Sequence, residues 1–62
     1  MAHMLLSAGD LRPADIIHTP NWDEHVIRAW PDKRGVAVVV AEFPDLILHY
    51  ALAEPLSIER AL

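Results

Sequence analysis

The chain of 62 residues is long enough for one domain only, and folding it hides roughly 60% of the surface that the unfolded chain exposes. It contains no cysteine, so disulfides and thiolate zinc sites are excluded as supports for a small core. Five Lys and Arg against nine Asp and Glu give a net charge of −4, which disfavours nucleic acid because non-specific phosphate binding requires cations. The 53% hydrophobic composition predicts a small globular domain, and a partner subunit is the support that remains.

The first ten residues carry little hydrophobic periodicity, so we predict an N-terminal tail over 1–10 and one domain over 11–62. Met1-Ala-His-Met4 resembles a remnant of an expression vector ahead of a native start, and His3 is therefore given no functional weight. For the segment from Met4 to Ala8, three alternatives stay open: disorder, a helical turn or an added edge strand.

Targeting signals are not evident. The opening lacks the basic and apolar regions of a signal peptide, and the longest apolar run, Val36 to Ala41, is far shorter than a membrane span. We therefore expect a cytoplasmic protein. Four Arg to one Lys and nine Ala to one Asn indicate a gene of high GC content, as in actinobacteria or their phages.

Five prolines divide the chain into short segments, because proline interrupts helices and central strands. Between them lie β-branched and aromatic residues at the spacing of a small all-β barrel or sandwich. We predict five strands, at about Asp15–Thr19, Glu24–Trp30, Val36–Glu42, Leu46–Leu52 and Leu56–Arg60. The alternative is an α+β fold with a β-hairpin and a helical C-terminal part over 45–52 and 57–62.

The segment Pro31-Asp-Lys-Arg-Gly35 predicts a hairpin, because Gly35 can adopt the positive φ that closes such a loop. Alternation along the preceding strand places Val26, Arg28 and Trp30 on one face and predicts that Trp30 lies in the core. The third and fourth strands are apolar on both faces, whereas a small barrel covers only one. Their second face therefore packs under a loop or meets another chain.

Five short strands in hairpin order resemble an SH3-like β-barrel. The segment Leu11-Arg-Pro-Ala-Asp-Ile-Ile17 is similar to the "L-x-P-G-D-x-I" entry into the first strand of many small barrels, and Ala14 stands where those barrels usually have glycine. The resemblance implies an all-β, five-stranded fold over about residues 11–60. Because this fold hosts peptide binding, nucleic-acid binding and assembly alike, the resemblance implies no functional residues.

Catalytic constellations are not recognisable in the sequence. Apart from Tyr50, the hydroxyl groups belong to Ser7, Thr19 and Ser57, and none of these lies in a nucleophile elbow. Two glycines cannot form a phosphate-binding loop. We therefore predict a protein that is not an enzyme and that requires no cofactor.

Three histidines are candidate metal ligands. A tight loop over 19–23 would bring His18 and His25 together beside Asp23, and zinc accepts such ligands. No compact H-x-H or H-x₃-H pair occurs, however, so we predict that His18, His25 and His49 are ordinary surface residues and that no tight metal site is present.

Trp22 lies in the polar loop Thr19-Pro-Asn-Trp-Asp-Glu24, where its large side chain either anchors a partner or folds back over an open barrel end.

We predict a non-enzymatic protein-interaction or self-assembly module, with a small nucleic-acid-associated regulator as the alternative. Leaving about four Val, Ile or Leu side chains exposed would forgo roughly 6–12 kcal/mol, which favours a two-fold dimer. The candidate partner-binding residues are Trp22, Val36, Val38, Val40 and Ile47.

Overall fold

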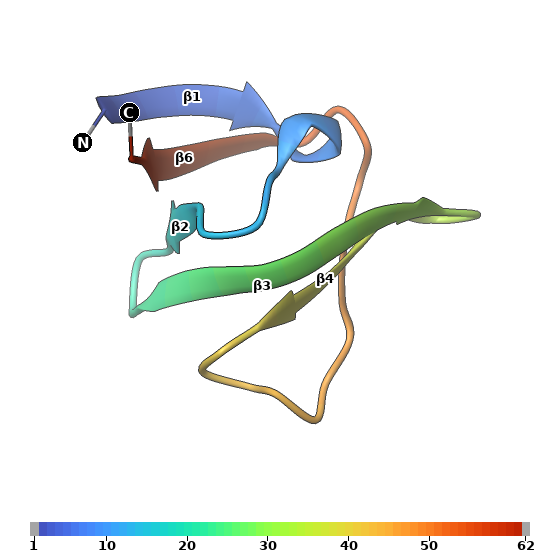
Figure 1. Ribbon diagram of the computed structural model, residues 1–62. Coiled ribbons are helices and arrows are strands. Elements are labelled where there is room, and N and C mark those ends of the chain that lie inside the picture. The colour runs from blue at the N-terminus through green and yellow to red at the C-terminus, as the bar shows by residue number, and fades with distance from the viewer. Residues whose placement is uncertain (1, 62) are drawn as a thin grey trace.

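The computed structural model describes residues 2–61, which form six β-strands and one 3₁₀ turn, with no α-helix in this part of the chain (Figure 1). The all-β class is therefore confirmed, and the helical alternative for the C-terminal part is wrong for the residues described. The elements are β1 (Ala2–Ser7), η1 (Ala8–Asp10), β2 (Ile16–His18), β3 (Asp23–Asp32), β4 (Gly35–Val40), β5 (Leu48–Tyr50) and β6 (Pro55–Arg60).

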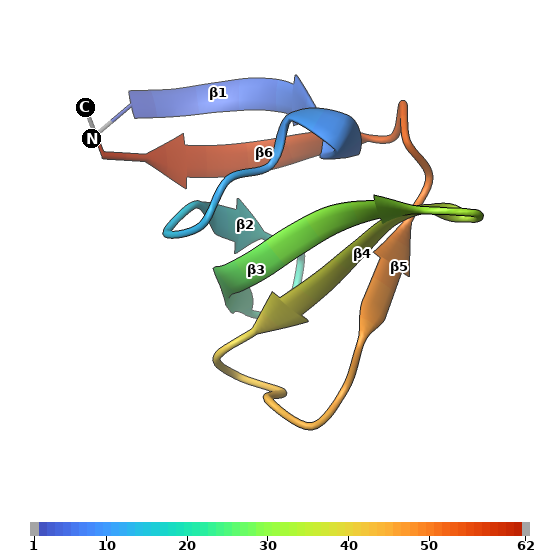
Figure 2. The ribbon, with the colours of Figure 1, turned by 45° about the vertical axis from the view of Figure 1, so that its right-hand side comes forward.

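The strands form one antiparallel sheet in the order β1-β6-β2-β3-β4-β5. Strands β2 to β5 follow one another as neighbours, and β6 returns to lie beside β2 (Figure 2). The sheet has six strands rather than the five predicted, and it is not closed into a barrel, because β1 and β5 form its two edges. The curved sheet places β1 and β6 across the interior from β3, β4 and β5 (Figure 2).

The sixth strand comes from the segment predicted as a tail. β1 pairs with β6 along its whole length, from Ala2 opposite Arg60 to Ser7 opposite Pro55. Its alternate residues Met4 and Leu6 pack against the core, whereas Leu5 is 72% exposed. The tail prediction is therefore wrong for the described residues 2–10, and the edge-strand alternative is the one observed.

A single hydrophobic core lies inside the curved sheet. Val36, Val38 and Val40 of β4 are 3%, 0% and 0% exposed. On the opposite face of β4, Ala37 is also buried, because its direct cross-strand neighbours are Trp30 and His49. Apolar residues on both faces of β4 are thus covered within the chain, except Val39, which is half-buried. The buried cluster contains Ala8, Leu11, Ile17, Val26, Val36, Val38, Val40, Leu56 and Ile58.

A β-bulge in β3 changes which side chains face the core. The register with β4 shifts between Val26 and Arg28, so Ile27 is the extra residue. Beyond the bulge Ala29 packs against the core, while Arg28 and Trp30 lie on the outer face. There the Arg28 guanidinium is 4.8 Å from the centroid of the Trp30 ring. The prediction of Trp30 as a core residue is therefore wrong, because strict alternation fails at a bulge.

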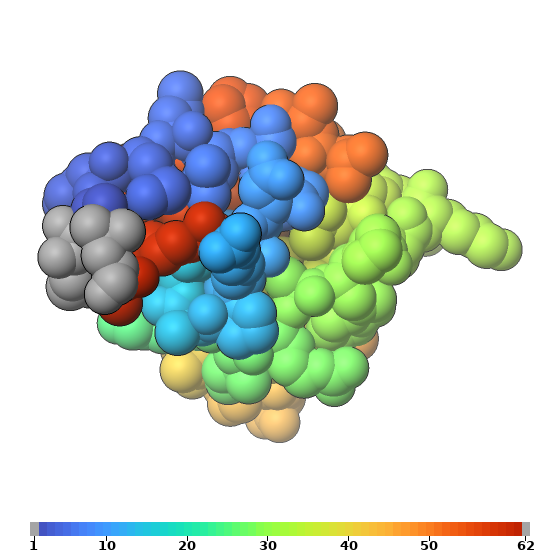
Figure 3. Space-filling view, turned by 45° about the horizontal axis from the view of Figure 1, so that its top comes forward, coloured from blue at the N-terminus to red at the C-terminus, as the bar shows by residue number. Residues whose placement is uncertain are grey.

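The predicted hairpin between β3 and β4 is confirmed. Asp32 pairs with Gly35 across the turn, and Gly35 has a φ of +135°. A Cβ atom at this position would lie 2.3 Å from the carbonyl oxygen of Tyr50, so the close approach of β5 also requires glycine. The turn projects from the body of the molecule (Figure 3).

The entry into β2 adopts the left-handed turn that glycine would favour. Ala14 has a φ of +75°, and its backbone N–H donates to the carbonyl oxygen of Val26 (2.9 Å). The turn is closed by Asp15, which accepts a hydrogen bond from the Arg12 backbone N–H (2.8 Å). The conformation is strained for alanine, because its Cβ atom comes too close to the following carbonyl oxygen, and glycine has no Cβ atom.

Replacing Ala14 with glycine is expected to stabilise the protein by about 0.5–1 kcal/mol. Glycine relieves the steric strain of the left-handed conformation in the folded state, and this gain in free energy is larger than the cost of the greater flexibility that glycine gives the unfolded chain. Ala14 is exposed, so no packing is lost. Chemical denaturation measures the change. Ala53→Gly is the control, because Ala53 is exposed without a positive φ and should lose stability instead. Equal losses in both variants would contradict the prediction.

Candidate protein-binding surface

Two connections of the sheet meet at one end of β3 and β4. The backbone N–H of Ala41 donates to the His25 carbonyl oxygen (2.9 Å), which continues the β3–β4 pairing past Val40. The β2–β3 and β4–β5 connections therefore lie side by side. They carry four large apolar residues, which we name the Trp22 surface: Trp22, Phe43, Leu46 and Ile47.

The β2–β3 connection is a tight four-residue turn that holds Trp22 in place. The Thr19 backbone N–H donates to the Trp22 carbonyl oxygen (3.0 Å), and so does the Thr19 hydroxyl (2.6 Å). The same hydroxyl accepts a hydrogen bond from the Trp22 backbone N–H (3.1 Å). Pro20 has the fixed φ that suits the second position of such a turn. The backbone position of Trp22 is therefore determined locally.

The Trp22 side chain is anchored on a buried carboxylate. Its indole Nε1–H donates to Oε2 of Glu24 (3.0 Å), and the Tyr50 hydroxyl donates to Oε1 (2.6 Å). Glu24 is only 4% exposed. Burial of Tyr50, together with its hydrogen bond to Glu24, raises the pKa of the tyrosine hydroxyl, which therefore stays protonated as a donor. The Glu24 carboxylate of β3 thus connects a side chain of the β2–β3 turn with a side chain of β5.

The remaining contacts of Trp22 leave much of its ring accessible. The ring meets Phe43 edge to face, with centroids 5.9 Å apart and an interplanar angle of 76°. Leu46 lies beside Phe43, because its backbone N–H donates to the Phe43 carbonyl oxygen (3.1 Å). Trp22 is nevertheless 48% exposed, and Leu46 and Ile47 are each 55% exposed. Trp22 is therefore fixed at its base but does not fold back as a complete lid.

Acidic residues flank the members of the Trp22 surface along the chain. Asp23 and Asp45 are exposed, and Glu42 binds the backbone N–H of His25 through Oε1 (2.7 Å) and its Nδ1 through Oε2 (2.5 Å). The hydrogen bonds from the His25 backbone and side chain lower the pKa of Glu42, which is ionised at neutral pH. Lys33 and Arg34 lie beyond the far end of β3, on the order of 30 Å away along this ten-residue strand.

The structure separates the five predicted partner-binding residues into two groups. Trp22 and Ile47 are at the surface, as predicted. Val36, Val38 and Val40 are wrong as surface residues, because they fill the core and no partner can reach them. Sequence reasoning missed Phe43 and Leu46. The available signal for Leu46 was its place in the apolar pair that follows the turn-forming Pro44-Asp45 before β5 begins.

The three predicted surface histidines lie in different places. His25 binds Glu42, and His49 Nε2 lies 3.0 Å from Oδ2 of Asp32. His18 and His25 are diagonal neighbours across β2 and β3, because the register pairs His25 with Ile16 and His18 with Asp23, but each of them binds a different carboxylate. His18 also lies near His3, whose ring stacks against it at a centroid distance of 5.3 Å.

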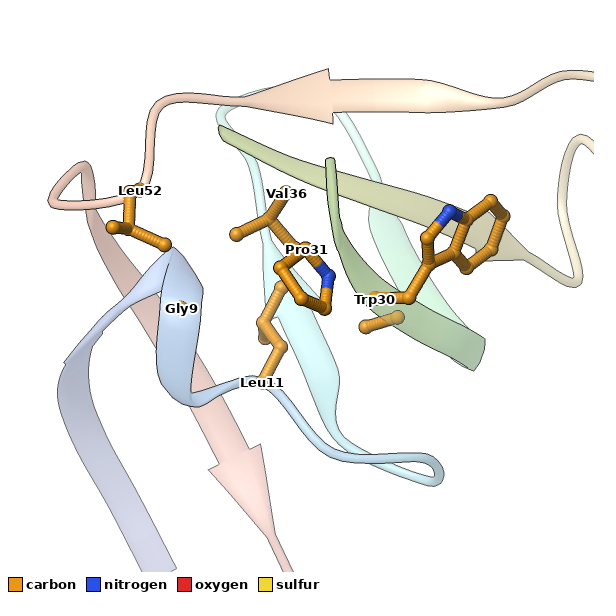
Figure 4. Close-up of a pocket in the computed structure, with 7 residues that line it drawn as sticks. Gly9, Leu11, Trp30, Pro31, Val36 and Leu52 are labelled. Atoms are coloured by element: carbon orange, nitrogen blue, oxygen red, sulfur yellow. The ribbon is translucent and has the colours of Figure 1, made fainter. Parts of the chain in front are cut away.

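Two depressions mark the surface elsewhere. One of about 90 Å³ lies between η1 and the β3–β4 hairpin and is bordered by Leu11, Pro31, Val36 and Leu52, while the indole of Trp30 is directed away from Leu52 (Figure 4). The other, of about 170 Å³, lies beside Arg12 and Arg60. Both are smaller than the roughly 300–1,000 Å³ of typical small-molecule sites.

No protein-family model, curated protein or solved structure matches this chain. Among the described residues, no helix is long and apolar enough to span a membrane.

Proposed function

We propose that this chain is a non-enzymatic protein-interaction module that binds its partner through the Trp22 surface. The observation that carries the proposal is the combination of exposure and rigidity at Trp22. Its ring is 48% exposed, yet its backbone is held by Thr19 and its indole N–H by Glu24. Preorganised aromatic side chains of this kind supply a large share of binding energy at protein interfaces, because little entropy is lost when they are covered.

We also propose that the architecture is a variant of the SH3-like barrel class. The five strands predicted from the sequence correspond to β2, β3, β4, β5 and β6, with β6 beside β2 and the others in hairpin order. β1 is then an addition that covers the outer edge of β6. The left-handed Ala14 at the entry into β2 supports the same likeness.

The charges around the Trp22 surface indicate the chemistry of the partner. Asp23, Glu42 and Asp45 are chain neighbours of Trp22, Phe43 and Leu46 and would supply an acidic rim, although Asp23 and Glu42 also bind His18 and His25. The cations Lys33 and Arg34 are at the distant hairpin turn. An apolar contact with an acidic rim is complementary to a segment that combines an aromatic or aliphatic anchor with flanking Lys or Arg. We therefore propose a basic, apolar protein segment as the partner.

Self-assembly through the same surface is the second form of the proposal. A two-fold contact would cover Trp22, Leu46 and Ile47 with their own counterparts. It would also bring two acidic rims together, so added salt should strengthen a dimer by screening their repulsion. Light scattering at tens of micromolar, at low and high salt, measures this. A single-chain mass at both salt concentrations would contradict self-assembly.

The alternative of a nucleic-acid-associated regulator requires cations gathered on one face. Arg60 is bound to Asp15, and Arg28 is stacked on Trp30. Lys33 and Arg34 occupy the hairpin turn, where the Arg34 backbone binds Asp32. This distribution, in a chain of net charge −4, supports the protein-binding proposal over the alternative.

Replacing Leu46 with aspartate is expected to weaken binding of a basic, apolar peptide by about tenfold or more, because it replaces an exposed apolar side chain of the Trp22 surface with a charged one. Fluorescence anisotropy with labelled peptides that carry a Trp or Leu anchor between lysines measures the affinity. Peptides with glutamate in place of lysine should bind more weakly.

The matched control is Leu5→Asp. Leu5 is 72% exposed and lies on β1, outside the Trp22 surface, so this variant carries the same change of charge. It should bind like the original chain. Equal affinity for lysine and glutamate peptides, or equal effects of the two variants, would contradict the proposed function.

A further inference from the structure

A second cluster of polar side chains lies on the outer face of the other half of the sheet. His3, Glu59 and His18 belong to β1, β6 and β2, which are adjacent in the sheet (Figures 1 and 2). Their chain neighbours Met4, Ile58 and Ile17 pack in or against the core. Because side chains alternate along a strand, all three polar groups point outward on the same face.

The side-chain atoms of this cluster converge. Nε2 of His3 lies 2.9 Å from Oε1 of Glu59, and Nε2 of His18 lies 3.2 Å from the same oxygen. The three possible ligand atoms all lie within 4.8 Å of one another. Ligands of a tetrahedral zinc ion are roughly 3.3 Å apart when the bonds are about 2.0–2.1 Å long. Small side-chain rotations would therefore bring two nitrogens and one oxygen to coordination distance.

Asp23 orients His18 for this role. Its Oδ1 lies 2.8 Å from Nδ1 of His18, at the ring position opposite to the one that faces Glu59. Without a metal ion both ring nitrogens of His18 face carboxylate oxygens, Nδ1 that of Asp23 and Nε2 that of Glu59. When an ion is bound, Asp23 would keep the Nδ1 proton and Nε2 would give its lone pair to the ion. Metal-binding histidines almost always have such a partner on their second nitrogen. The arrangement thus supplies two nitrogen ligands, one oxygen ligand and an outer carboxylate.

We propose that His3, His18 and Glu59 bind a divalent transition-metal ion, with Zn²⁺ as the preferred ion, and that Asp23 positions His18. Mixed imidazole and carboxylate ligands suit zinc, and a fourth position is left for water. The proposed site differs from the expectations that His18 is an ordinary surface residue and that His3 has no functional weight. It depends on β1, which the sequence left as one of three alternatives, because the β1–β6 pairing places His3 opposite Glu59.

Zinc affinity is measured by competition with a chromophoric chelator, and Co²⁺ absorption reports the coordination geometry. His3→Ala, His18→Ala and Glu59→Gln are each expected to weaken zinc binding by more than about tenfold, and Asp23→Asn by about tenfold. Zinc should raise the thermal midpoint of the original chain but not that of His18→Ala. Circular dichroism without metal confirms that the variants fold.

His25→Ala and His49→Ala are the matched controls, because each of these exposed histidines has a carboxylate partner but neither belongs to a group of three possible ligands among the described residues. Both should bind zinc as the original chain does. His3 lies in the segment Met1-Ala-His-Met4, which resembles a vector remnant. The His3→Ala variant therefore shows how much of the zinc affinity depends on this segment. Unchanged affinity in His3→Ala or His18→Ala, or an equal loss in the controls, would overturn the three-ligand site.

Discussion

Val38→Lys is expected to leave the chain unfolded at neutral pH. Val38 is 0% exposed and lies in the middle of β4, between Ala29 of β3 and Leu48 of β5. An ammonium group at this position would be desolvated without a partner, at a cost of at least several kcal/mol. A domain of this size has a stability of roughly 3–9 kcal/mol, so the loss is comparable to the whole. Far-UV circular dichroism and thermal unfolding measure the effect.

Val39→Lys tests the same argument on the other face of the strand. Val39 is half-buried and points away from the core, opposite Arg28. A lysine there can extend its charge into water and faces only a weak repulsion, so the expected loss is about 1 kcal/mol. A folded Val38→Lys variant, or two variants of equal stability, would show that the core is not where the structure places it.

Arg60→Met is expected to lower the thermal midpoint by roughly 15 °C, because it leaves the carboxylate of Asp15 buried without its cation. Asp15 is 1% exposed. The Arg60 guanidinium binds both of its oxygens, with Nε 2.8 Å from Oδ1 and Nη2 2.8 Å from Oδ2. This pair connects the end of β6 to the entry into β2. Differential scanning calorimetry measures the midpoint.

The effect of Arg60→Met should depend on pH. Burial by itself raises the pKa of Asp15, but the hydrogen bonds from Arg60 and from the Arg12 backbone outweigh it and leave the pKa below its usual value. The ionised carboxylate therefore stabilises the fold above the unfolded-state pKa, and this contribution is lost as the pH falls through the folded-state pKa. In Arg60→Met the buried carboxylate is instead relieved by protonation. The difference between the two proteins should shrink from pH 7 to pH 3.

Asp15→Asn is the control for this pair. It removes the charge but keeps an oxygen acceptor, and the Arg60 side chain, 18% exposed, can still reach water. Its loss of stability at pH 7 should be smaller than that of Arg60→Met. A pH-independent difference between Arg60→Met and the original chain would contradict the role of the ion pair.

Local chemistry is sufficient to predict much of this fold. The prolines and β-branched segments predict the strands that became β2 to β6, because these signals act on the backbone within a few residues. Gly35 predicts the β3–β4 hairpin for the same reason, since positive φ is a local property. Trp22 in a polar loop, and Ile47 after a turn, were recognisable as candidate surface residues.

Long-range pairing decided the rest. β1 has weak local signals and forms because β6 offers it a complete antiparallel edge. The bulge at Ile27 moves Trp30 out of the core, and period-two alternation contains no information about such an insertion. The face of β4 that is buried depends on the curvature of the whole sheet, so Val36, Val38 and Val40 could not be assigned to core or surface beforehand. The convergence of His3, His18 and Glu59 requires three strands to be adjacent, although up to 56 residues separate these positions in sequence. Spacing along the chain cannot reveal a site whose ligands are brought together only by the order and register of strands in the sheet.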